Sequence, residues 1–187
     1  MCGRYTAEED TSIDMRALYR ELRMSYPEVQ LKSGEIYPTE TVPLLCGRDK
    51  TPVPGTWGFP KYDGKGVIIN ARAESVQEKV SFRDAFYHRR CLVPTTGYFE
   101  WSRQKVKYRF GLPDAPMFCL AGLWTHTNEG LRFVILTTDA NASVLPVHHR
   151  MPLVLTGEMT DAWVHSAQDA ARCLGVSPPM LVRQECC

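Results

Sequence analysis

The most distinctive chemistry in this chain belongs to its first residues, Met1-Cys2-Gly3-Arg4-Tyr5. A methionine before a small residue is usually trimmed in cells, and its removal would give Cys2 a free α-amine beside its thiol. The reference pKa of an α-amine is about 7.7–8.0, against about 10.4 for lysine, so far more of it is neutral and nucleophilic near pH 7. Such an amine condenses with an aldehyde to an imine, onto which the thiol can close as a thiazolidine. The alternative is that a cysteine stands at this position without any function.

A carboxylate between aromatic residues, in Gly97-Tyr98-Phe99-Glu100-Trp101, is the second candidate group. Alternation along a strand places Tyr98 and Glu100 on one face and their neighbours on the other. We expect Glu100 to be partly desolvated, which raises a carboxyl pKa toward the range useful to an acid or base. The alternative is a glutamate on an edge strand that faces water.

A third group of polar residues, Asn70-Ala71-Arg72-Ala73-Glu74, follows the apolar run 67–69. If the strand continues, Asn70, Arg72 and Glu74 share a face. Asparagine offers both a donor and an acceptor, and arginine offers the planar fork that suits phosphate. The alternative is an ion pair between Arg72 and Glu74 at the surface, which contributes little.

Two histidines in His148-His149-Arg150-Met151-Pro152 precede an apolar strand. Histidine is the natural proton shuttle near neutral pH. Adjacent residues of a strand point in opposite directions, so we expect at most one of the two to face a given pocket. The alternative is a histidine with a purely structural role beside the core.

The composition sets the frame for these groups. A chain of 187 residues with 44% hydrophobic and 23% charged residues fits one soluble domain, residues 1–187. A net charge of +1 argues against binding of nucleic acid through the overall charge of the protein, but it allows a local basic cleft. The seven cysteines form no C-x-x-C pair, and no run is long enough to span a bilayer. We therefore expect no metal, no cofactor, no membrane contact and a reducing, cytoplasmic location.

The pattern of apolar residues predicts the elements that carry these groups. Helical spacing predicts a helix over residues 12–24 and a closing helix over 160–171 that buries Trp163. A capping-box pattern from Ser81 to Asp84 predicts a short helix through Phe86. Strands are predicted at residues 42–46, 67–69, 91–94, 97–101, 108–112, 117–124, 132–138 and 152–155, with a helical turn at 141–147. The fold class is α+β: a mostly antiparallel sheet, curled into a barrel-like body, with short flanking helices.

Together and in this order, the four motifs resemble the SOS-response-associated peptidase (SRAP) family. The segments 57–59 and 137–141 are also similar to that family, and the resemblance runs from Cys2 to about Leu155. It implies a protein that acts on abasic sites in single-stranded DNA, as a monomer that associates with the nucleoid when bound to DNA. The cysteine would form a thiazolidine with the ring-opened sugar and shield the lesion.

The resemblance also implies roles for individual residues. Cys2 would be the nucleophile. Asn70 would orient the cysteine or the sugar, Glu100 would act as acid and base, and His148 would move protons at the sugar hydroxyl. The positions expected to hold phosphates are Arg4, Arg72 and Arg150.

An aromatic shelf for the bases beside the lesion is placed at Tyr62 by position alone. The family often has Tyr-Asn-x-Ala-Pro early in the chain, where this sequence has Tyr37-Pro38-Thr39-Glu40. Glu40 would place an unfavourable charge near DNA if that loop lines the groove. Two other functions stay open: a peptidase or self-processing hydrolase that uses Cys2, and a module that binds single-stranded DNA without covalent chemistry.

Overall fold

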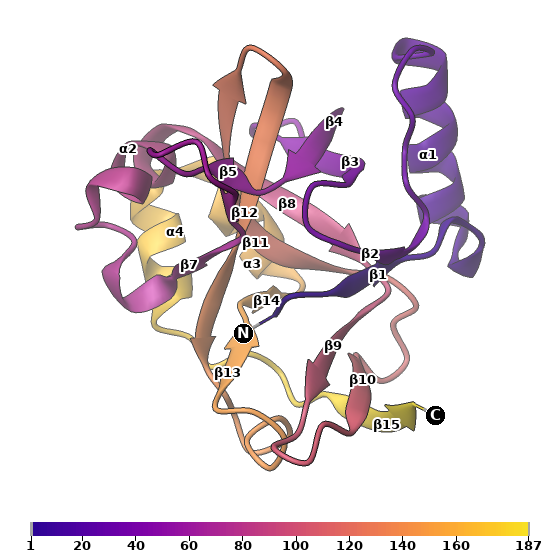
Figure 1. The fold of residues 1–187 in the computed structure, drawn as a ribbon, viewed down its shortest axis with the longest axis vertical. Helices are drawn as coiled ribbons and strands as arrows, with labels where there is room; N and C mark the ends of the chain where they lie inside the picture. The colour runs from indigo at the N-terminus through magenta and orange to yellow at the C-terminus, as the bar shows by residue number, and fades with distance from the viewer. Residues whose placement is uncertain (1, 187) are drawn as a thin grey trace.

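A closed five-stranded barrel forms the centre of the protein (Figure 1). The computed structural model describes residues 2–186; Met1 and Cys187 lie outside the described residues. Around the ring the strands are β12 (Gly130–Asp139), β4 (Thr51–Trp57), β3 (Thr41–Cys46), β8 (Arg90–Thr95) and β11 (Phe118–Thr127). The ring closes because β11 pairs with β12 as well as with β8, and within it the β12–β4 pairing is parallel while the others are antiparallel. The predicted barrel-like α+β body is confirmed.

The barrel strand β12 is apolar on both faces along its middle. Phe133 and Ile135 belong to the cluster inside the barrel, whereas Val134 and Leu136 belong to a second cluster outside it. Alternate residues of a strand point to opposite faces, so a strand covered on both sides needs an unbroken apolar run. The outer cluster is covered by helices, so both faces of β12 are buried.

Three helices cover the outer face and a fourth lies on the opposite side (Figure 1). The cover comes from α2 (Val80–His88), α3 (Glu158–His165) and α4 (Ala167–Leu174), and the separate helix is α1 (Ile13–Ser25). The prediction for α1 is confirmed, with the Ser12 hydroxyl accepting a hydrogen bond from the Met15 N–H at 3.1 Å as its N-cap. The described residues contain no helix long and apolar enough to cross a membrane.

Two helix predictions need correction. The expected capping box at Ser81 is wrong, because α2 begins at Val80 and no side chain caps its start. The expected closing helix is two helices, because Ser166 has an extended backbone (φ −146°, ψ 160°) and its hydroxyl caps α4 instead. Trp163 is buried as predicted, and its indole N–H donates to the carbonyl of Cys91 at 3.0 Å.

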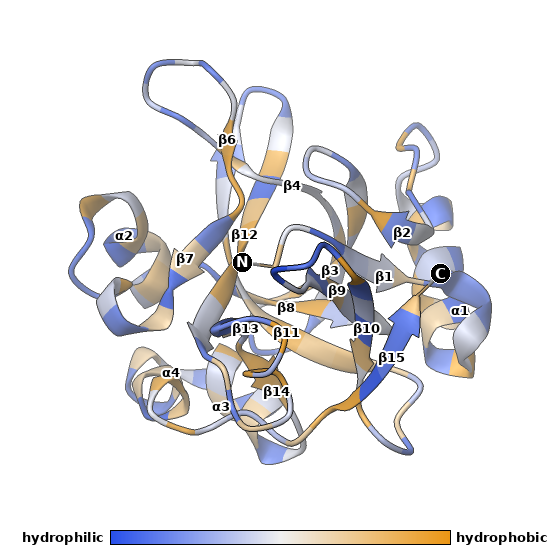
Figure 2. Cartoon of the chain, turned by 60° about the horizontal axis from the view of Figure 1, so that its bottom comes forward, coloured by the Kyte–Doolittle hydropathy of each residue, from blue (hydrophilic) through white to orange (hydrophobic). Residues whose placement is uncertain are grey.

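A second sheet of five strands lies beside the barrel. Its order is β15 (Val182–Cys186), β10 (Lys107–Gly111), β9 (Gly97–Trp101), β1 (Tyr5–Ala7) and β2 (Gly34–Ile36). The chain passes from β8 of the barrel directly into β9 at Gly97, where a Cβ atom would lie 2.9 Å from the Phe110 carbonyl oxygen. Only glycine permits that close approach. The strand β15 was not predicted, since its residues are polar and mostly exposed (Figure 2).

Short strands complete the edges. β7 (Asn70–Arg72) and β13 (Arg150–Pro152) both pair with β12, and β14 (Val154–Leu155) pairs with β11. β5 (Phe59–Pro60) and β6 (Val67–Ile68) form a separate hairpin whose hydrophilic loop extends from the body (Figure 2). The predicted strand at 152–155 is thus divided between β13 and β14.

Candidate active site

The N-terminal cysteine lies in the core and is held by backbone contacts. The side chain of Cys2 is fully buried, and its carbonyl oxygen accepts a hydrogen bond from the Asn70 side-chain amide at 2.8 Å. The next residues are fixed because β1 pairs between β2 and β9, with Tyr5 opposite Tyr98. The Phe99 N–H donates to the Arg4 carbonyl at 2.9 Å. The structure therefore brings the first and second motifs together.

Glu100 lies inside the protein near this cysteine. Glu100 is only 3% exposed, so the alternative of a glutamate that faces water is wrong. Burial raises the pKa of the Glu100 carboxyl above its ordinary value of 4.5. Burial also raises the pKa of the Cys2 thiol far above normal, and the Glu100 carboxylate adds to that shift. Tyr98, on the same face of β9, has a pKa raised by burial and by both of these groups. We call Cys2, Tyr98 and Glu100 the reaction cluster.

The raised pKa values of the Cys2 thiol and the Glu100 carboxyl determine which group of Cys2 can react first. A thiol with a raised pKa stays protonated at neutral pH and is a poor nucleophile. A neutral α-amine needs no such ionisation. A raised pKa makes the buried Glu100 carboxylate a stronger base than an exposed one, which suits a group that accepts and returns a proton. The cluster is therefore suited to attack by an amine, followed by the thiol.

The two histidines stand side by side before β13. The ring centroids of His148 and His149 are 4.5 Å apart and the rings are stacked at 26°. The expectation that they point in opposite directions is wrong, because both precede the strand and the chain bends at His149. Burial lowers the pKa of His148. His149 in turn lowers the pKa of Glu100, so both rings belong to the surroundings of the reaction cluster.

A cavity of about 590 Å³ opens next to the histidines. It is lined by residues 101–104, at and after the end of β9, and by residues 145–149, before β13. Arg103, His148 and His149 give it a basic wall, and Trp101 gives it an aromatic one. We call this space the basic cavity. One wall is the segment that follows Glu100, and the other is the segment that contains His148.

Comparison with known protein families gives a match over nearly the whole chain. The model of the family described as SOS response associated peptidase (SRAP) matches residues 1–182. The chain belongs to the SRAP family. A solved structure of a protein from Bacteroides thetaiotaomicron has the same fold, with a TM-score of 0.81 at 24% identity over 98% of this chain and 91% of that one.

Curated relatives of this SRAP chain include two abasic site processing proteins. YoqW of Bacillus subtilis (strain 168) is 36% identical over 107 residues, which cover 52% of this chain and 48% of that protein. YedK of Escherichia coli (strain K12) is 29% identical over 179 residues, which cover 88% of this chain and 79% of that protein. The chain thus matches about half the length of YoqW.

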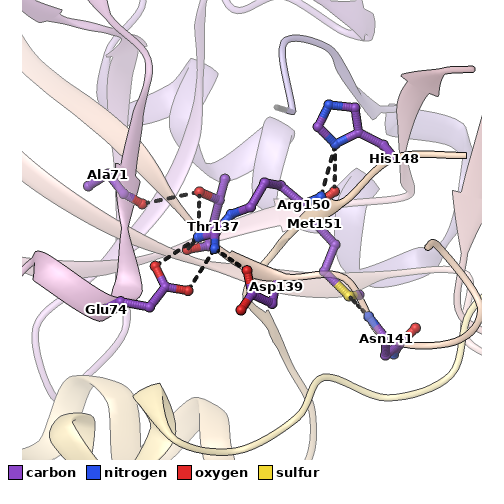
Figure 3. A network of polar contacts seen from close by, with 8 residues as sticks. All are labelled: Ala71, Glu74, Thr137, Asp139, Asn141, His148, Arg150 and Met151. Carbon is purple, nitrogen blue, oxygen red and sulfur yellow. Dashed lines mark hydrogen bonds and ion pairs between the residues drawn. The ribbon is translucent and has the colours of Figure 1, made fainter. Parts of the chain in front are cut away.

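Among the three arginines that the resemblance assigns to phosphates, Arg150 is buried and paired (Figure 3). Its side chain is 7% exposed, and its Nη1 lies 2.7 Å from carboxylate oxygens of both Glu74 and Asp139. Its Nε atom has no hydrogen-bond partner among the described residues, and the assignment of a phosphate to Arg150 stays a prediction. The expected surface pair between Arg72 and Glu74 is replaced, because Glu74 pairs with Arg150.

Arg72 and Arg4 lie nearer the surface. Arg72 is exposed at the end of β7, and the strand does not continue to Glu74, which lies in a 3₁₀ turn. The Arg4 guanidinium donates to Glu35 at 3.1 Å and stacks 3.8 Å above the ring of Tyr37. Lys107 donates to the same Glu35 oxygen at 2.8 Å.

Tyr62 and Glu40 both lie outside the basic cavity. Tyr62 is fully exposed on the β5–β6 loop, in a separate hollow formed with Phe59, Ile68 and neighbouring residues. Glu40 accepts a hydrogen bond from the Tyr37 N–H at 2.8 Å, so its charge is used within its own turn.

Sequence reasoning missed His149 and Arg103. His149 stands next to His148 in the sequence, but the alternation of side chains along a strand predicted that it would face away from the pocket. Arg103 follows the Glu100 motif by three residues but lies in a turn, where no periodicity applies. Among residues 2–186, no group of three or more His, Cys, Asp or Glu residues is placed to hold a metal ion.

Proposed function

We propose that this protein recognises abasic sites in single-stranded DNA and binds them covalently through Cys2 once Met1 has been removed. The observation that carries the proposal is the burial of Cys2 beside Glu100, with a basic cavity at the end of the same strand. The relatives YoqW and YedK are named abasic site processing proteins, which supports the proposal. The product is a thiazolidine that shields the lesion.

The first chemical step joins the α-amine of Cys2 to the C1′ aldehyde of the ring-opened sugar. The amine nitrogen bonds to the carbonyl carbon, and the nitrogen proton passes to the Glu100 carboxylate. Protonated Glu100 then returns this proton to the former carbonyl oxygen, which gives a neutral carbinolamine. The second nitrogen proton reaches the same oxygen, again with Glu100 as carrier, so the oxygen leaves as water and a neutral imine remains. A raised carboxyl pKa suits both transfers, since it makes the carboxylate a stronger base for accepting the proton that it must then return.

The second step closes the ring. The Cys2 sulfur bonds to the imine carbon, and the thiol proton is transferred, with Glu100 as carrier, to the imine nitrogen. The sum of both steps joins an amine, a thiol and an aldehyde and releases one water. The order follows from the thiol, whose raised pKa keeps it protonated until the positive charge of a protonated imine develops beside it.

The remaining residues hold and serve the substrate in this proposal. Asn70 orients Cys2 through the 2.8 Å bond to its carbonyl oxygen, and His148 moves protons at the sugar hydroxyl. Arg4 and Arg72 contact phosphates, as does the basic wall of the cavity. An abasic sugar enters a narrow pocket without the unstacking of a base, which favours this lesion as the target.

A cysteine peptidase is less well supported. That chemistry uses a thiolate at neutral pH, whereas burial raises the pKa of the Cys2 thiol. A purely non-covalent binding module leaves the buried Cys2 and Glu100 pair without a purpose.

The test is a denaturing gel of the purified protein mixed with single-stranded DNA that carries one abasic site. Parallel lanes contain DNA with all its bases and the Cys2→Ala variant, and intact mass confirms that the wild-type protein starts at Cys2. We expect a heat-resistant shifted band only with the abasic site and only with Cys2. Absence of that band from correctly processed protein overturns the proposal and favours the peptidase.

A further inference from the structure

Two cysteines that the proposed chemistry does not use face each other across two barrel strands. Cys46 ends β3, and Cys91 is the second residue of β8, the antiparallel neighbour of β3 (Figure 1). The register places the two residues directly opposite each other. Opposite residues of an antiparallel pair have Cα atoms about 4.5–5.5 Å apart, inside the range of about 4.4–6.8 Å that disulfides need. The backbone is therefore already arranged for a bond between the two sulfurs.

The two side chains also share one face of the barrel wall. Cys91 belongs to the cluster inside the barrel, and Cys46 packs against that cluster. Burial raises the pKa of the Cys91 thiol, and a hydrogen bond with Cys46 raises it further, so the two thiols are in contact. On the other side of Cys91, a Cβ atom at Gly122 would lie 2.8 Å from the Cys91 sulfur. Glycine at that position leaves the sulfur room to turn toward Cys46.

The two thiols differ in their access to solvent. Cys91 is fully buried, whereas Cys46 is partly exposed. Cys46 is followed by the turn 47–50, most of which is exposed and which leads into β4. A small molecule in solution can therefore reach the Cys46 sulfur first, and the Cys91 sulfur is reached through it.

The other cysteines between residues 2 and 186 have no cysteine opposite them in a strand pairing. Cys119 of β11 stands opposite Pro94 and Leu155, and it belongs to the cluster outside the barrel. Cys173 lies in α4, and Cys186 of β15 is opposite a lysine. The pairing of Cys46 with Cys91 is thus a specific feature of the described part of the chain, and Cys119 provides a matched control.

We propose that Cys46 and Cys91 form a redox-active pair, which a low-molecular-weight disulfide converts into a cross-strand disulfide and which an excess of thiol restores. The inference is independent of the proposed function. Cytosolic disulfides are commonly transient and reversible, and a pair with one accessible thiol suits such an exchange.

The exchange takes two steps. The Cys46 sulfur bonds to one sulfur of the small disulfide, and the other half leaves as a thiol that carries the Cys46 proton. The Cys91 sulfur then bonds to the Cys46 sulfur and displaces the attached half, which leaves with the Cys91 proton. The two cysteines together lose two hydrogens and two electrons are transferred, so the small disulfide is reduced to two thiols.

The direct test treats the full-length protein with oxidised glutathione, blocks the remaining thiols by alkylation and maps tryptic fragments by mass. Cleavage after lysine and arginine places Cys46 in fragment 33–48 and Cys91 in fragment 91–103, each without another cysteine. We expect these two fragments to be linked, with two hydrogens fewer than their sum, and to separate after excess reduced glutathione. Glutathione on Cys46 beside an alkylated Cys91 overturns the inference, because the second step has then failed. Two alkylated cysteines also overturn it.

Two variants show whether the linkage is specific. Cys46→Ala should abolish the linked fragments, and Cys119→Ala, which removes a barrel cysteine without a cysteine opposite, should keep them. Linkage of Cys46 or Cys91 mainly to some other cysteine in the wild-type protein overturns the pairing.

Thermal melting tests whether the native barrel accommodates the bond. A disulfide between residues 46 and 91 restricts the unfolded chain, so oxidation should raise the melting temperature by roughly 5–15 °C. The rise should disappear with excess thiol, and Cys46→Ala should show none. A melting temperature that falls on oxidation means that the bond distorts the barrel, and it overturns the inference even where linked fragments are found.

Discussion

The reaction cluster and the basic cavity are neighbours with opposite physical properties. Cys2, Tyr98 and Glu100 are each at most 3% exposed, and burial raises the pKa of all three. The cavity beside them is open, about 590 Å³ in volume, and lined by Arg103 and two histidines. Proton transfer and imine formation gain from a site that excludes water, whereas capture of a charged strand gains from exposed cations. The reaction cluster and the basic cavity therefore lie in separate regions, although Glu100 and the cavity residue Trp101 are consecutive in β9.

This separation predicts two classes of variant. Changes in the reaction cluster should alter the covalent step and leave DNA affinity intact. Changes in the basic cavity should alter affinity and its salt dependence and leave the saturated rate intact. A variant that changes both quantities equally argues that the two regions act as one.

The largest effect is expected from Cys2→Ser. Serine keeps the α-amine, so an imine should still form and should be trapped by borohydride reduction. The hydroxyl is a far weaker nucleophile than the thiol, so the heat-resistant band should disappear without the reductant. Gels with and without borohydride measure this, and Cys2→Ala provides the comparison for an amine with no nucleophile beside it. A heat-resistant band from Cys2→Ser without the reductant contradicts the role given to sulfur.

The next effect is expected from Glu100→Gln. The amide has nearly the same shape but does not exchange a proton near neutral pH, so the single-turnover rate should fall about a hundred-fold or more. DNA affinity should be unchanged or slightly higher, because a negative charge is removed. Rates at saturating DNA and affinities from fluorescence anisotropy decide this. Equal losses in rate and affinity would place Glu100 in the binding surface instead.

The stability of the protein should also report on Glu100. Its pKa is raised in the folded state above 4.5, so between these two values the folded state binds more protons than the unfolded state. The free energy of unfolding then falls as pH rises through that window, by about 1.4 kcal/mol for each unit of pKa difference. Glu100→Gln should lose this slope and be the more stable protein above the window. Urea unfolding at several pH values measures it, and a slope that persists in the variant assigns it to another group.

The fold and the reaction cluster were largely predictable from local patterns. Alternation placed Tyr98 and Glu100 on one face of a strand, and apolar runs identified the barrel strands β3, β8, β11 and β12. The barrel strand β4 was missed, because it contains two prolines and a glycine and has no apolar run. The full burial of Cys2 was not predictable, because it depends on β1 pairing between β2 and β9, which are distant in sequence. β15 was missed for a related reason: its polar, exposed residues are recognisable as a strand only through pairing with β10.

The errors at the candidate site share a physical cause. The strand rule separated His148 from His149, but a bend before β13 stacks their rings. A surface pair between Arg72 and Glu74 was the alternative for the third motif, but Glu74 pairs with Arg150 of another strand. Side-chain partners that come from different strands are set by tertiary packing, and local spacing does not contain that information.

A smaller effect, confined to binding, is expected from Arg103→Ala. Arg103 lines the basic cavity, and its removal should weaken affinity a few-fold and reduce the salt slope by about 0.7, the value for one phosphate of a single strand. The rate at saturating DNA should match wild type. Affinity measured over a range of salt concentrations provides both quantities. A lower saturated rate would show that Arg103 also positions the reacting sugar.

The smallest effect is expected from Tyr62→Ala, and the contrast with Trp101→Ala locates the stacking surface. Trp101 lines the basic cavity one residue after Glu100, whereas Tyr62 lies in a separate hollow on the β5–β6 loop. Loss of one stacked base costs about 1–3 kcal/mol of binding free energy, so Trp101→Ala should weaken affinity by that amount. Tyr62→Ala should match wild type, although the sequence alone placed the shelf there. If instead Tyr62→Ala is the weaker binder, the strand runs toward the β5–β6 hairpin, and the boundary between cavity and loop drawn from the described residues must move with it.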